Sequence, residues 1–495
     1  MRRAGVLLHP TALPGSHACG TFGAVAHQWL DQLGDHGIKA WQLLPLAPTD
    51  GLGSPYSSPS GFALNPWLLD AELLLADGLI DQADLQVLPR GGDSHRLELD
   101  LAQQRAFALG QALLQRYPSW GDERHERFEH WRDQQRDWLV DHCRFMVLRR
   151  RHNGQPWWQW PAPLAQRQRA AMRALDQQEH QALLQEALVQ WQLQEQWQRL
   201  LDHARQRQVQ VIGDLPFYVA HDSADVWSHR RLFSARSDGE LIEQSGVPPD
   251  YFSATGQLWG TPVYRWPLHR LTRFRWWLRR LERQLSLFDL LRLDHFRALD
   301  AAWCVPGADR TAEHGRWRPS PGRSLLRKLS RRCGAAGLPL IAEDLGVITP
   351  AVEALRDRHH LPGMKILQFA FDGHADNPYL PVNYQGSNWC VYTGTHDNAT
   401  CIGWWQSLGE EQRHQVEALL GPVHAPGWQL LELALASRAD WAVVPLQDLL
   451  NLGDEARFNT PGTSAGNWCW RLASNLDQIK GPLQGLGELA QRHQR

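Results

Sequence analysis

The sequence predicts an α/β fold, specifically a (β/α)8 barrel of the TIM type with large, mainly helical insertions. The first observation is that eight short apolar segments recur along the chain, each followed by Gly, Pro, Asp or Asn and then by a helical pattern. Continuous apolar runs separated by helices are typical of a parallel sheet that is covered on both faces. The second observation is the length of 495 residues. Since a bare barrel takes about 250 residues, much of the chain must lie in insertions.

The predicted strands follow one another through the whole chain, so we expect residues 1–495 to form a single barrel domain. In order, they lie at residues 5–9, 40–44, 209–214, 287–294, 339–343, 365–371, 390–395 and 441–445. The largest insertion, at about 65–205, is rich in Gln, Arg, Glu, Leu and Trp. Apolar residues at near-helical spacing predict that it is a helical subdomain leading into a barrel helix. These residues are Leu184, Leu188, Trp191, Trp197 and Leu201.

Composition and charge are those of an ordinary globular protein, with 43% hydrophobic residues and a formal net charge of -2. The electrostatic footprint of a nucleic-acid or anionic-membrane partner is therefore missing. No segment approaches the roughly 20 apolar residues of a membrane span, and the apolar run after the two N-terminal arginines is shorter than a secretory signal needs. The seven cysteines are scattered, without zinc-site spacing. We expect reduced thiols, a cytoplasmic location and no metal site.

Three acidic residues close apolar runs: Asp294 in LRLDHFR, Glu343 in IAEDLG and Asp397 in TGTHDN. Barrel enzymes carry their reacting groups at the C-terminal ends of strands, so these carboxylates are candidates for a site that the insertions would surround. A single carboxylate at a strand end is more often a helix cap or a salt-bridge partner. Three of them on separate strands, two beside His or Arg, favour an active site.

Arg292 and Asp294 are two residues apart, so on a strand they project to the same side. A guanidinium beside Asp294 would keep that carboxylate ionised, as a nucleophile requires. A buried Arg–Asp pair that merely braces the barrel is an equally good interpretation of this spacing alone.

Further motifs accompany the three carboxylate strings along nearly the whole chain. They are GSPYSSPS at 53–60, GDLP at 213–216, DSADVW at 222–227, GVPPDYFS at 246–253, TGQLWG at 255–260 and NWCWR at 467–471. Each motif is weak alone, but together and in this order they are specific. From about residue 5 to residue 473, the chain resembles glycoside hydrolase family 77, the 4-α-glucanotransferases, also called amylomaltases or disproportionating enzymes.

The resemblance implies an enzyme that moves a segment of α-1,4-glucan to the 4-hydroxyl of glucose or of another α-1,4-glucan. It implies that Asp294 is the nucleophile, Glu343 the general acid/base, and Asp397 a third carboxylate that holds sugar hydroxyls. A retaining reaction of this kind requires the nucleophile and the acid to lie about 5–5.5 Å apart. Glu343 must then be protonated when it meets the glycosidic oxygen, which requires a raised pKa.

The resemblance also implies a set of sugar-binding residues. Arg292 and His396 would contact the sugar at the cleavage point, Asp214 would hold Arg292 or a hydroxyl, and Tyr56 would stack on a sugar ring. Tyr251 and Phe252 would lie on a lid loop over the site, within a second insertion at about 220–285. The remaining implied positions are Ser54, Gln257, Trp259, Asp372 and Asn467.

The expected partners are an α-1,4-glucan donor and a glucose or maltooligosaccharide acceptor. We expect no cofactor, no nucleic acid and no membrane, and a monomer or weak homodimer. Departures from the family pattern at Thr261, Arg265, Val382 and Ala399 leave the acceptor subsites and the preferred chain length open. Two alternatives remain, an α-amylase-like hydrolase and a catalytically inactive glucan-binding protein. The complete set of three carboxylates argues against the second.

Overall fold

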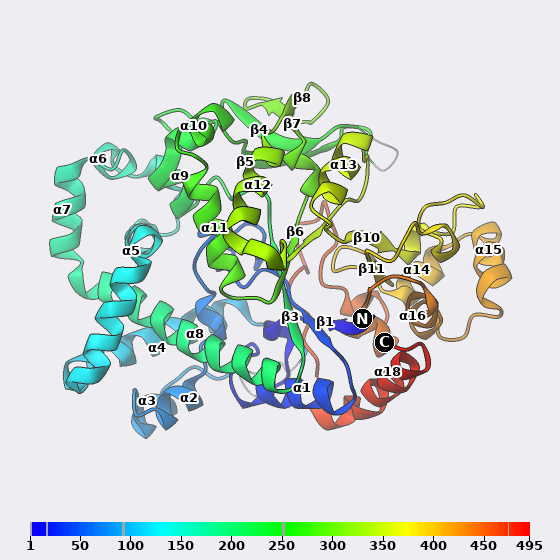
Figure 1. The fold of residues 1–495 in the computed structure, drawn as a ribbon. Coiled ribbons are helices and arrows are strands. Elements are labelled where there is room, and N and C mark those ends of the chain that lie inside the picture. The colour runs from blue at the N-terminus through cyan, green and yellow to red at the C-terminus, as the bar shows by residue number, and fades with distance from the viewer. Residues whose placement is uncertain (1, 16–17, 92–94, 250–252, 474) are drawn as a thin grey trace.

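The barrel predicted from the sequence is present in the computed structural model, which describes residues 2–15, 18–91, 95–249, 253–473 and 475–495. Its strands close in the order β1-β12-β11-β10-β9-β6-β3-β2. Every pairing within the barrel is parallel. All strands therefore end at the same face, with helices on the outside (Figure 1).

Each of the eight predicted strand segments overlaps one barrel strand. The strands are β1 (Arg3–Leu7), β2 (Ala40–Gln42), β3 (Gln210–Leu215), β6 (Leu290–Leu293), β9 (Leu340–Ala342), β10 (Gly363–Ile366), β11 (Trp389–Tyr392) and β12 (Trp441–Pro445). The prediction for 365–371 was wrong in extent, because β10 begins at Gly363 and the 3-10 helix η8 (Leu367–Phe369) follows it. Within η8, the buried Gln368 side chain donates to the carbonyl of Ala399, 2.9 Å away.

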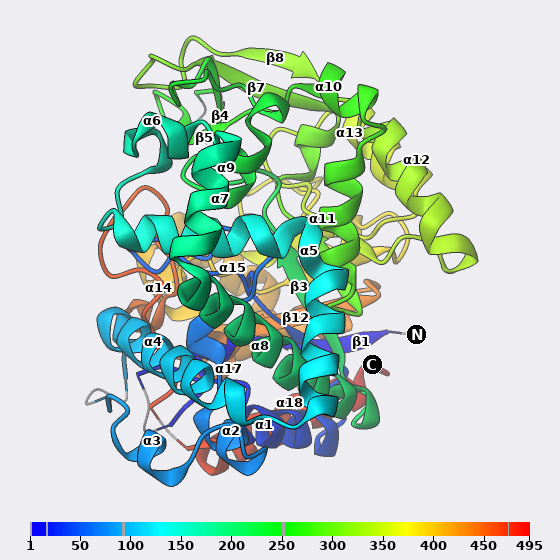
Figure 2. The ribbon, with the colours of Figure 1, turned by 90° about the vertical axis from the view of Figure 1, so that its left-hand side faces the viewer.

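The described residues between 65 and 205 form helices and connecting loops. The helices are α2 (Ala71–Ala76), α3 (Gln82–Gln86), α4 (Leu99–Arg116), α5 (Asp122–Arg151), α6 (Ala162–Ala165), α7 (Arg169–Gln178) and α8 (His180–Gln206). Figure 2 shows α4, α5 and α7 beside the long helix α8, which they contact. Trp191, Trp197 and Leu201 of α8 are buried, and Trp197 donates to the carbonyl of Leu287, 2.8 Å away, just before β6. Helix α8 thus joins these helices to the barrel.

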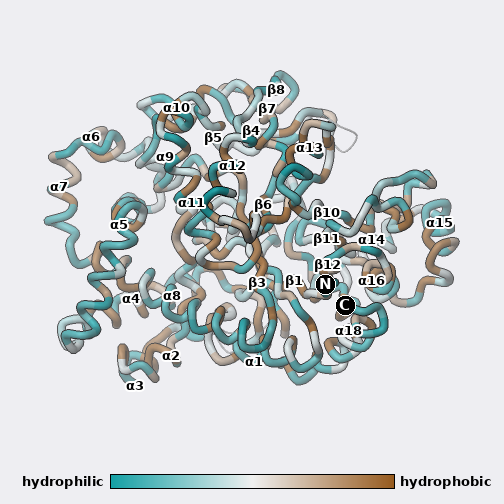
Figure 3. Tube along the Cα trace, in the orientation of Figure 1, coloured by the Kyte–Doolittle hydropathy of each residue, from teal (hydrophilic) through white to brown (hydrophobic). Residues whose placement is uncertain are grey.

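Other helices complete the outside of the barrel and the loops at its rim. They are α1 (Ala24–Asp35), α9 (Ala224–His229), α10 (Trp266–Leu271), α11 (Arg275–Leu285), α12 (Gly322–Cys333), α13 (Pro350–Arg358), α14 (Cys401–Ser407), α15 (Glu410–Leu420), α16 (Pro426–Ala436), α17 (Leu446–Leu449) and α18 (Lys480–Arg492). Helix α1 contacts α8 and α18, and α11 contacts α12. Figure 3 shows hydrophobic residues along β3 and β6 at the centre, where these layers meet. None of the helices in the described ranges has the length and apolarity to cross a membrane.

A second sheet was not predicted from the sequence. It is antiparallel, with the order β5-β4-β7-β8, and lies at the top of Figure 1. Its strands are β4 (Glu243–Val247), β5 (Gln257–Pro262), β7 (Ala301–Pro306) and β8 (Arg316–Pro319). All four residues of β8 are exposed and β5 is largely exposed. Strands β5 and β8 therefore lack the apolar alternation by which a half-buried strand is identified in a sequence.

Close packing beside the candidate site makes Gly213 of β3 a test of the fold. A Cβ atom at this position would lie 2.2 Å from the ring of Phe288. We expect Gly213→Ala to lower the free energy of unfolding by about 1–3 kcal/mol through overpacking, seen as a lower Tm. The control is Gly51→Ala, because a Cβ there would meet nothing within 4 Å. Equal Tm values for the two variants would contradict this account of the packing.

Candidate active site

The three candidate carboxylates lie at the face where the barrel strands end. Asp294 directly follows β6, Glu343 directly follows β9, and Asp397 lies in the loop after β11. Strand β6 pairs with β9 on one side and with β3 on the other. The register between β3 and β6 places Asp214 opposite Arg292. The barrel therefore brings four charged residues from three adjacent strands to one edge.

Arg292 joins two carboxylates in the barrel mouth. Its Nη1 atom donates to both oxygens of Asp214, at 2.8 and 2.7 Å, and its Nη2 atom lies 2.9 Å from Asp294 Oδ1. The side chains of Arg292 and Asp214 are 5% and 1% exposed, whereas that of Asp294 is 30% exposed. The guanidinium therefore braces the barrel through Asp214 and also holds the accessible carboxylate of Asp294.

The two carboxylates beside Arg292 keep its buried guanidinium positively charged. Burial alone would lower the pKa of its guanidinium, but Asp214 and Asp294 raise the pKa well above its ordinary value. Arg292 thus places a positive charge 2.9 Å from Asp294 Oδ1. Asp294 thus has the contacts that a carboxylate nucleophile needs.

Glu343 lies in a different environment from Asp294. Its Oε2 atom accepts a hydrogen bond from the backbone N–H of His295 at 2.6 Å, and Oε1 accepts from the backbone N–H of Leu345 at 3.1 Å. Burial, together with the negative charge of Asp294, raises its pKa from 4.5 to about 8, while Arg292 and the two N–H groups oppose the shift. Glu343 therefore retains its proton at neutral pH, as a general acid must.

Asp397 is the most exposed of the three carboxylates, with 46% of its side chain accessible. Its Oδ1 atom accepts from Asn459 Nδ2 at 2.6 Å, and its Oδ2 atom lies 3.3 Å from His396 Nε2. Arg457 donates to its main-chain oxygen at 2.6 Å. Asn459, His396 and Arg457 thus fix the position of Asp397, while its carboxylate remains partly exposed to solvent.

Tyr56 connects the Asp214–Arg292–Asp294 group with the loop that carries His396 and Asp397. Its hydroxyl donates to Asp214 Oδ2 at 2.6 Å, and its ring stacks on that of His396 with centroids 5.1 Å apart. The indole of Trp468 lies 5.6 Å from the same ring. Since Asp214 is bonded to Arg292, a continuous set of contacts runs from Asp294 to Asp397. The stacking of Tyr56 on a sugar stays a prediction.

Gln257 and Trp259 lie beside this cluster, on β5. The Trp259 side chain is 37% exposed, with its ring edge-on to His295 at 4.8 Å, and its Nε1 atom donates to Gln257 Oε1 at 3.3 Å. Tyr218 is 5.9 Å from Trp259. The antiparallel sheet therefore places the indole of Trp259 against the ring of His295, the residue that follows Asp294.

Other predicted site residues hold loops in this structure. Ser54 Oγ accepts from the backbone N–H of Tyr56 at 3.3 Å. Asn467 accepts from the N–H of Thr460 and donates to the carbonyl of Thr463, at 2.9 and 3.0 Å, and so shapes the loop before Trp468.

One predicted residue, Asp372, is not joined to the cluster, and two others are not described by the structure. Asp372 is exposed and accepts from the N–H of His374 at 3.0 Å; within the described ranges no contact joins it to the carboxylate cluster. Tyr251 and Phe252 lie outside the described residues.

Four residues of the site were missed from the sequence: Tyr218, His295, Asn459 and Trp468. His295 adjoins Asp294 and Trp468 adjoins Asn467, so their positions beside candidate residues could have signalled them. Asn459 and Tyr218 carry no such signal. Among the residues described, no three His, Cys, Asp or Glu side chains gather as a metal site would require.

Comparisons with known proteins show similarity along nearly the whole chain. The family model described as 4-alpha-glucanotransferase matches residues 8–477. A 4-alpha-glucanotransferase of Synechocystis sp. is 43% identical over 488 residues, covering 98% of this chain and 96% of that protein. One from Thermus thermophilus is 42% identical over 479 residues, covering 95% of each.

A solved structure agrees as well. The amylomaltase from Streptococcus agalactiae, in complex with acarbose, has a TM-score of 0.95 and 31% identity and covers 100% of both chains. A model that spans nearly the whole sequence, together with relatives at this level of identity, shows the family. The chain belongs to the 4-α-glucanotransferases, the amylomaltase family of enzymes.

Proposed function

We propose that this enzyme transfers a segment of α-1,4-glucan to the 4-hydroxyl of glucose or of another α-1,4-glucan, with retention, through a glycosyl ester of Asp294. The observation that carries the proposal is the contrast between two adjoining carboxylates. Asp294 is paired with Arg292, while the pKa of Glu343 is raised to about 8. Such a pair of environments supports a nucleophile and an acid. The acarbose complex of the related amylomaltase supports an oligosaccharide as ligand.

In the first step, Asp294 attacks the anomeric carbon of the donor. The C1–O4 bond breaks as the bond from C1 to the carboxylate oxygen forms, and the Glu343 proton passes to O4 of the leaving sugar. In the second step, Glu343 takes the proton of the acceptor 4-hydroxyl, whose oxygen attacks C1 and releases Asp294 as a carboxylate. This reversal of roles follows from microscopic reversibility.

The charge on Asp294 links the two steps. In the free enzyme, the negative charge of Asp294 is one of the causes that raise the pKa of Glu343. Esterification neutralises Asp294, so this cause is absent in the intermediate and the pKa of Glu343 falls. Glu343 is therefore an acid before the donor bond breaks and a base after it has broken.

The remaining candidates are assigned to the sugar. Asp397, held by Asn459 and His396, would bind the hydroxyls of the sugar at the cleavage point. Tyr251 and Phe252 would form the lid that favours an acceptor sugar over water. Each tenfold preference for the sugar corresponds to about 1.4 kcal/mol in the transition state.

We further propose that residues 1–495 form one catalytic unit, with the 65–205 helices and the 220–285 segment as its insertions. The packing of α8 against α1 and β3 supports this organisation. We also propose a cytoplasmic location. It is supported by the cysteines, since all seven are free and five of them are buried.

The product profile on maltotriose tests the proposed function. A transferase is expected to make glucose and longer oligosaccharides with almost no gain in reducing ends, because one glycosidic bond forms for each that breaks. Chromatography of the products and a reducing-sugar assay measure the two quantities. A steady rise in reducing ends would identify a hydrolase instead, and retained glucan binding without any product would identify an inactive binding protein.

Removal of the nucleophile tests the role of Asp294. We expect Asp294→Asn to lower the transfer rate on maltotriose by at least about 10³-fold, the scale seen when a residue of a catalytic set is removed, while glucan binding persists. Asp376→Asn is the control, since Asp376 is exposed and outside the site. Near-wild-type turnover in Asp294→Asn, with an unchanged Tm, would place the nucleophile elsewhere.

The pH dependence tests the role of Glu343. Because its pKa is about 8, kcat/KM is expected to fall as the pH rises through this value, by about tenfold per unit above it.

The stability of the fold gives an independent readout of the same group. A pKa above the unfolded value contributes stability that is present below about pH 4.5 and lost as the pH rises through about 8. The Tm of Glu343→Gln relative to that of the wild type is therefore expected to rise between pH 5 and pH 9. A constant difference would contradict the raised pKa.

A further inference from the structure

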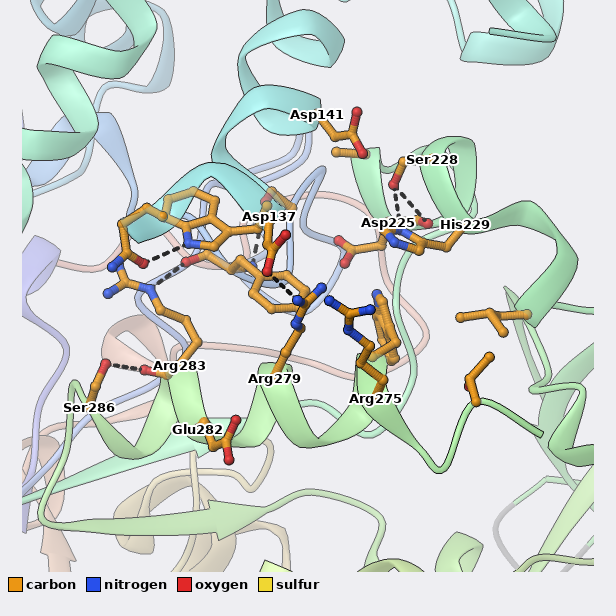
Figure 4. A pocket seen from close by; sticks show the side chains of 18 of the residues that line it. Asp137, Asp141, Asp225, Ser228, His229, Arg275, Arg279, Glu282, Arg283 and Ser286 are labelled. Atoms are coloured by element: carbon orange, nitrogen blue, oxygen red, sulfur yellow. Dashed lines mark hydrogen bonds and ion pairs between the residues drawn. The ribbon is translucent and has the colours of Figure 1, made fainter. Parts of the chain in front are cut away.

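A cavity of about 710 Å³ lies apart from the carboxylate cluster, between helices α5, α9 and α11. Figure 4 shows it with α11 below and with α5 and α9 on the opposite side. None of the candidate catalytic or sugar-binding residues lines it. Its volume falls within the range of about 300–1,000 Å³ that is typical of small-molecule sites.

The charged groups of the cavity nearly balance. Carboxylates are supplied by Asp137, Asp141, Asp225 and Glu282. Guanidinium groups are supplied by three arginines one turn apart on α11, at positions 275, 279 and 283. Because neither sign dominates, the lining favours a neutral ligand over an anion or a cation. Because donors and acceptors are both present, it favours a ligand rich in hydroxyl groups.

Aromatic side chains supply the apolar part of the lining. Trp138 is half-buried, and its ring lies parallel to that of Phe62 with centroids 6.4 Å apart. Trp276 is buried beside them, 6.1 Å from Phe62. Aromatic rings next to paired acids and arginines form a surface that can take both the C–H faces and the hydroxyls of a pyranose.

Two buried donors in this lining have no partner in the described part of the chain: Trp276 Nε1 and Arg283 Nη2. Trp276 and Arg283 are 5% and 8% exposed. Buried polar groups are nearly always hydrogen-bonded, and an unsatisfied one is costly. Water or a ligand hydroxyl in the cavity would supply the missing acceptors.

Other lining groups are fixed in place by the protein. Asp137 pairs with Arg279, Asp141 accepts from Arg167 at 2.6 Å, and Asp225 Oδ2 accepts from the backbone N–H of Gly61 at 2.8 Å. Arg275 is exposed and has no ion pair among the residues described; in Figure 4 its guanidinium points toward Asp225. The cavity thus combines preset acceptors with the exposed guanidinium of Arg275 and the two buried donors, Trp276 Nε1 and Arg283 Nη2.

We propose that this cavity is a second binding site for α-1,4-glucan, which holds a short stretch of the chain away from the reacting carboxylates. The inference rests on the proposed function, because it takes the polymer from the transfer reaction. A long glucan that is held at a second point dissociates more slowly and is bound more tightly than a short one. The site therefore bears on long substrates and not on maltotriose.

Kinetics with matched arginine variants test the inference. Arg275→Ala is expected to raise KM for amylose about tenfold, the scale of a lost hydrogen bond to a charged group, with kcat unchanged. Its kinetics on maltotriose should equal those of the wild type. Arg270→Ala is the control, since Arg270 is exposed on α10 and does not line the cavity. Amylose KM values for Arg275→Ala and Arg270→Ala that agree would overturn the inference.

A direct binding measurement separates this inference from the proposed function. In the non-turnover variant Asp294→Asn, titration calorimetry with maltotetraose is expected to give two binding events, and in Asp294→Asn/Arg275→Ala one. Trp138→Leu in the same background, with its Tm checked, should also remove one event. A single event in Asp294→Asn that Arg275→Ala leaves unchanged would overturn the second site while transfer on maltotriose stands. Binding of inorganic phosphate in place of maltotetraose would identify an anion site instead and would also overturn the inference.

Discussion

The buried guanidinium of Arg292 is the constraint on which the rest of the site depends. A charge inside a barrel is tolerated only when it is paired and hydrogen-bonded, and here the pairing partner is Asp214 on the adjacent strand. The same guanidinium reaches Asp294, so the group that pairs with Asp214 inside the barrel also orients the proposed nucleophile. Tyr56 then bonds to Asp214 and stacks on His396, which extends the fixed geometry to the loop of Asp397. Loss of the Arg292–Asp214 pair would leave a buried charge and release this whole set of contacts.

Two chemically similar carboxylates acquire different roles from their surroundings. Asp294 is next to a permanent positive charge and is partly open to solvent. Glu343 is withdrawn from water and adjoins Asp294, so its protonated form is favoured despite two backbone N–H donors. The hydrogen bond from His295 N–H to Glu343 matters for position as much as for charge, because His295 directly follows Asp294. The backbone N–H of His295, the residue after Asp294, thus fixes the position of the Glu343 side chain.

The barrel and the carboxylates could be predicted from the sequence because both leave local signals. An apolar run such as 441–445 matches β12 residue for residue, and acids that end such runs must share one face of a parallel barrel. Strands β5 and β8 of the antiparallel sheet left no such signal, since they are exposed, and β4 contains Gly246. Asn459 could not be predicted either, because it reaches Asp397 only through the folding of a loop 62 residues further along the chain. Local patterns report burial, whereas contacts between loops depend on the complete fold.

Helix α11 shows how the site and the distant cavity share one support. Arg280 donates to the carbonyls of Pro216 and Phe217, just after Asp214, at 2.8 and 3.0 Å. One turn further on, Arg283 donates to the carbonyl of Phe62, in the loop that follows Tyr56, at 3.1 Å. A single helix therefore holds the segments that carry Asp214 and Tyr56, and Arg283 with other residues of the same helix also lines the cavity. These hydrogen bonds lie within the protein and need no ligand, so α11 holds the backbone beside Asp214 whether or not the cavity is occupied.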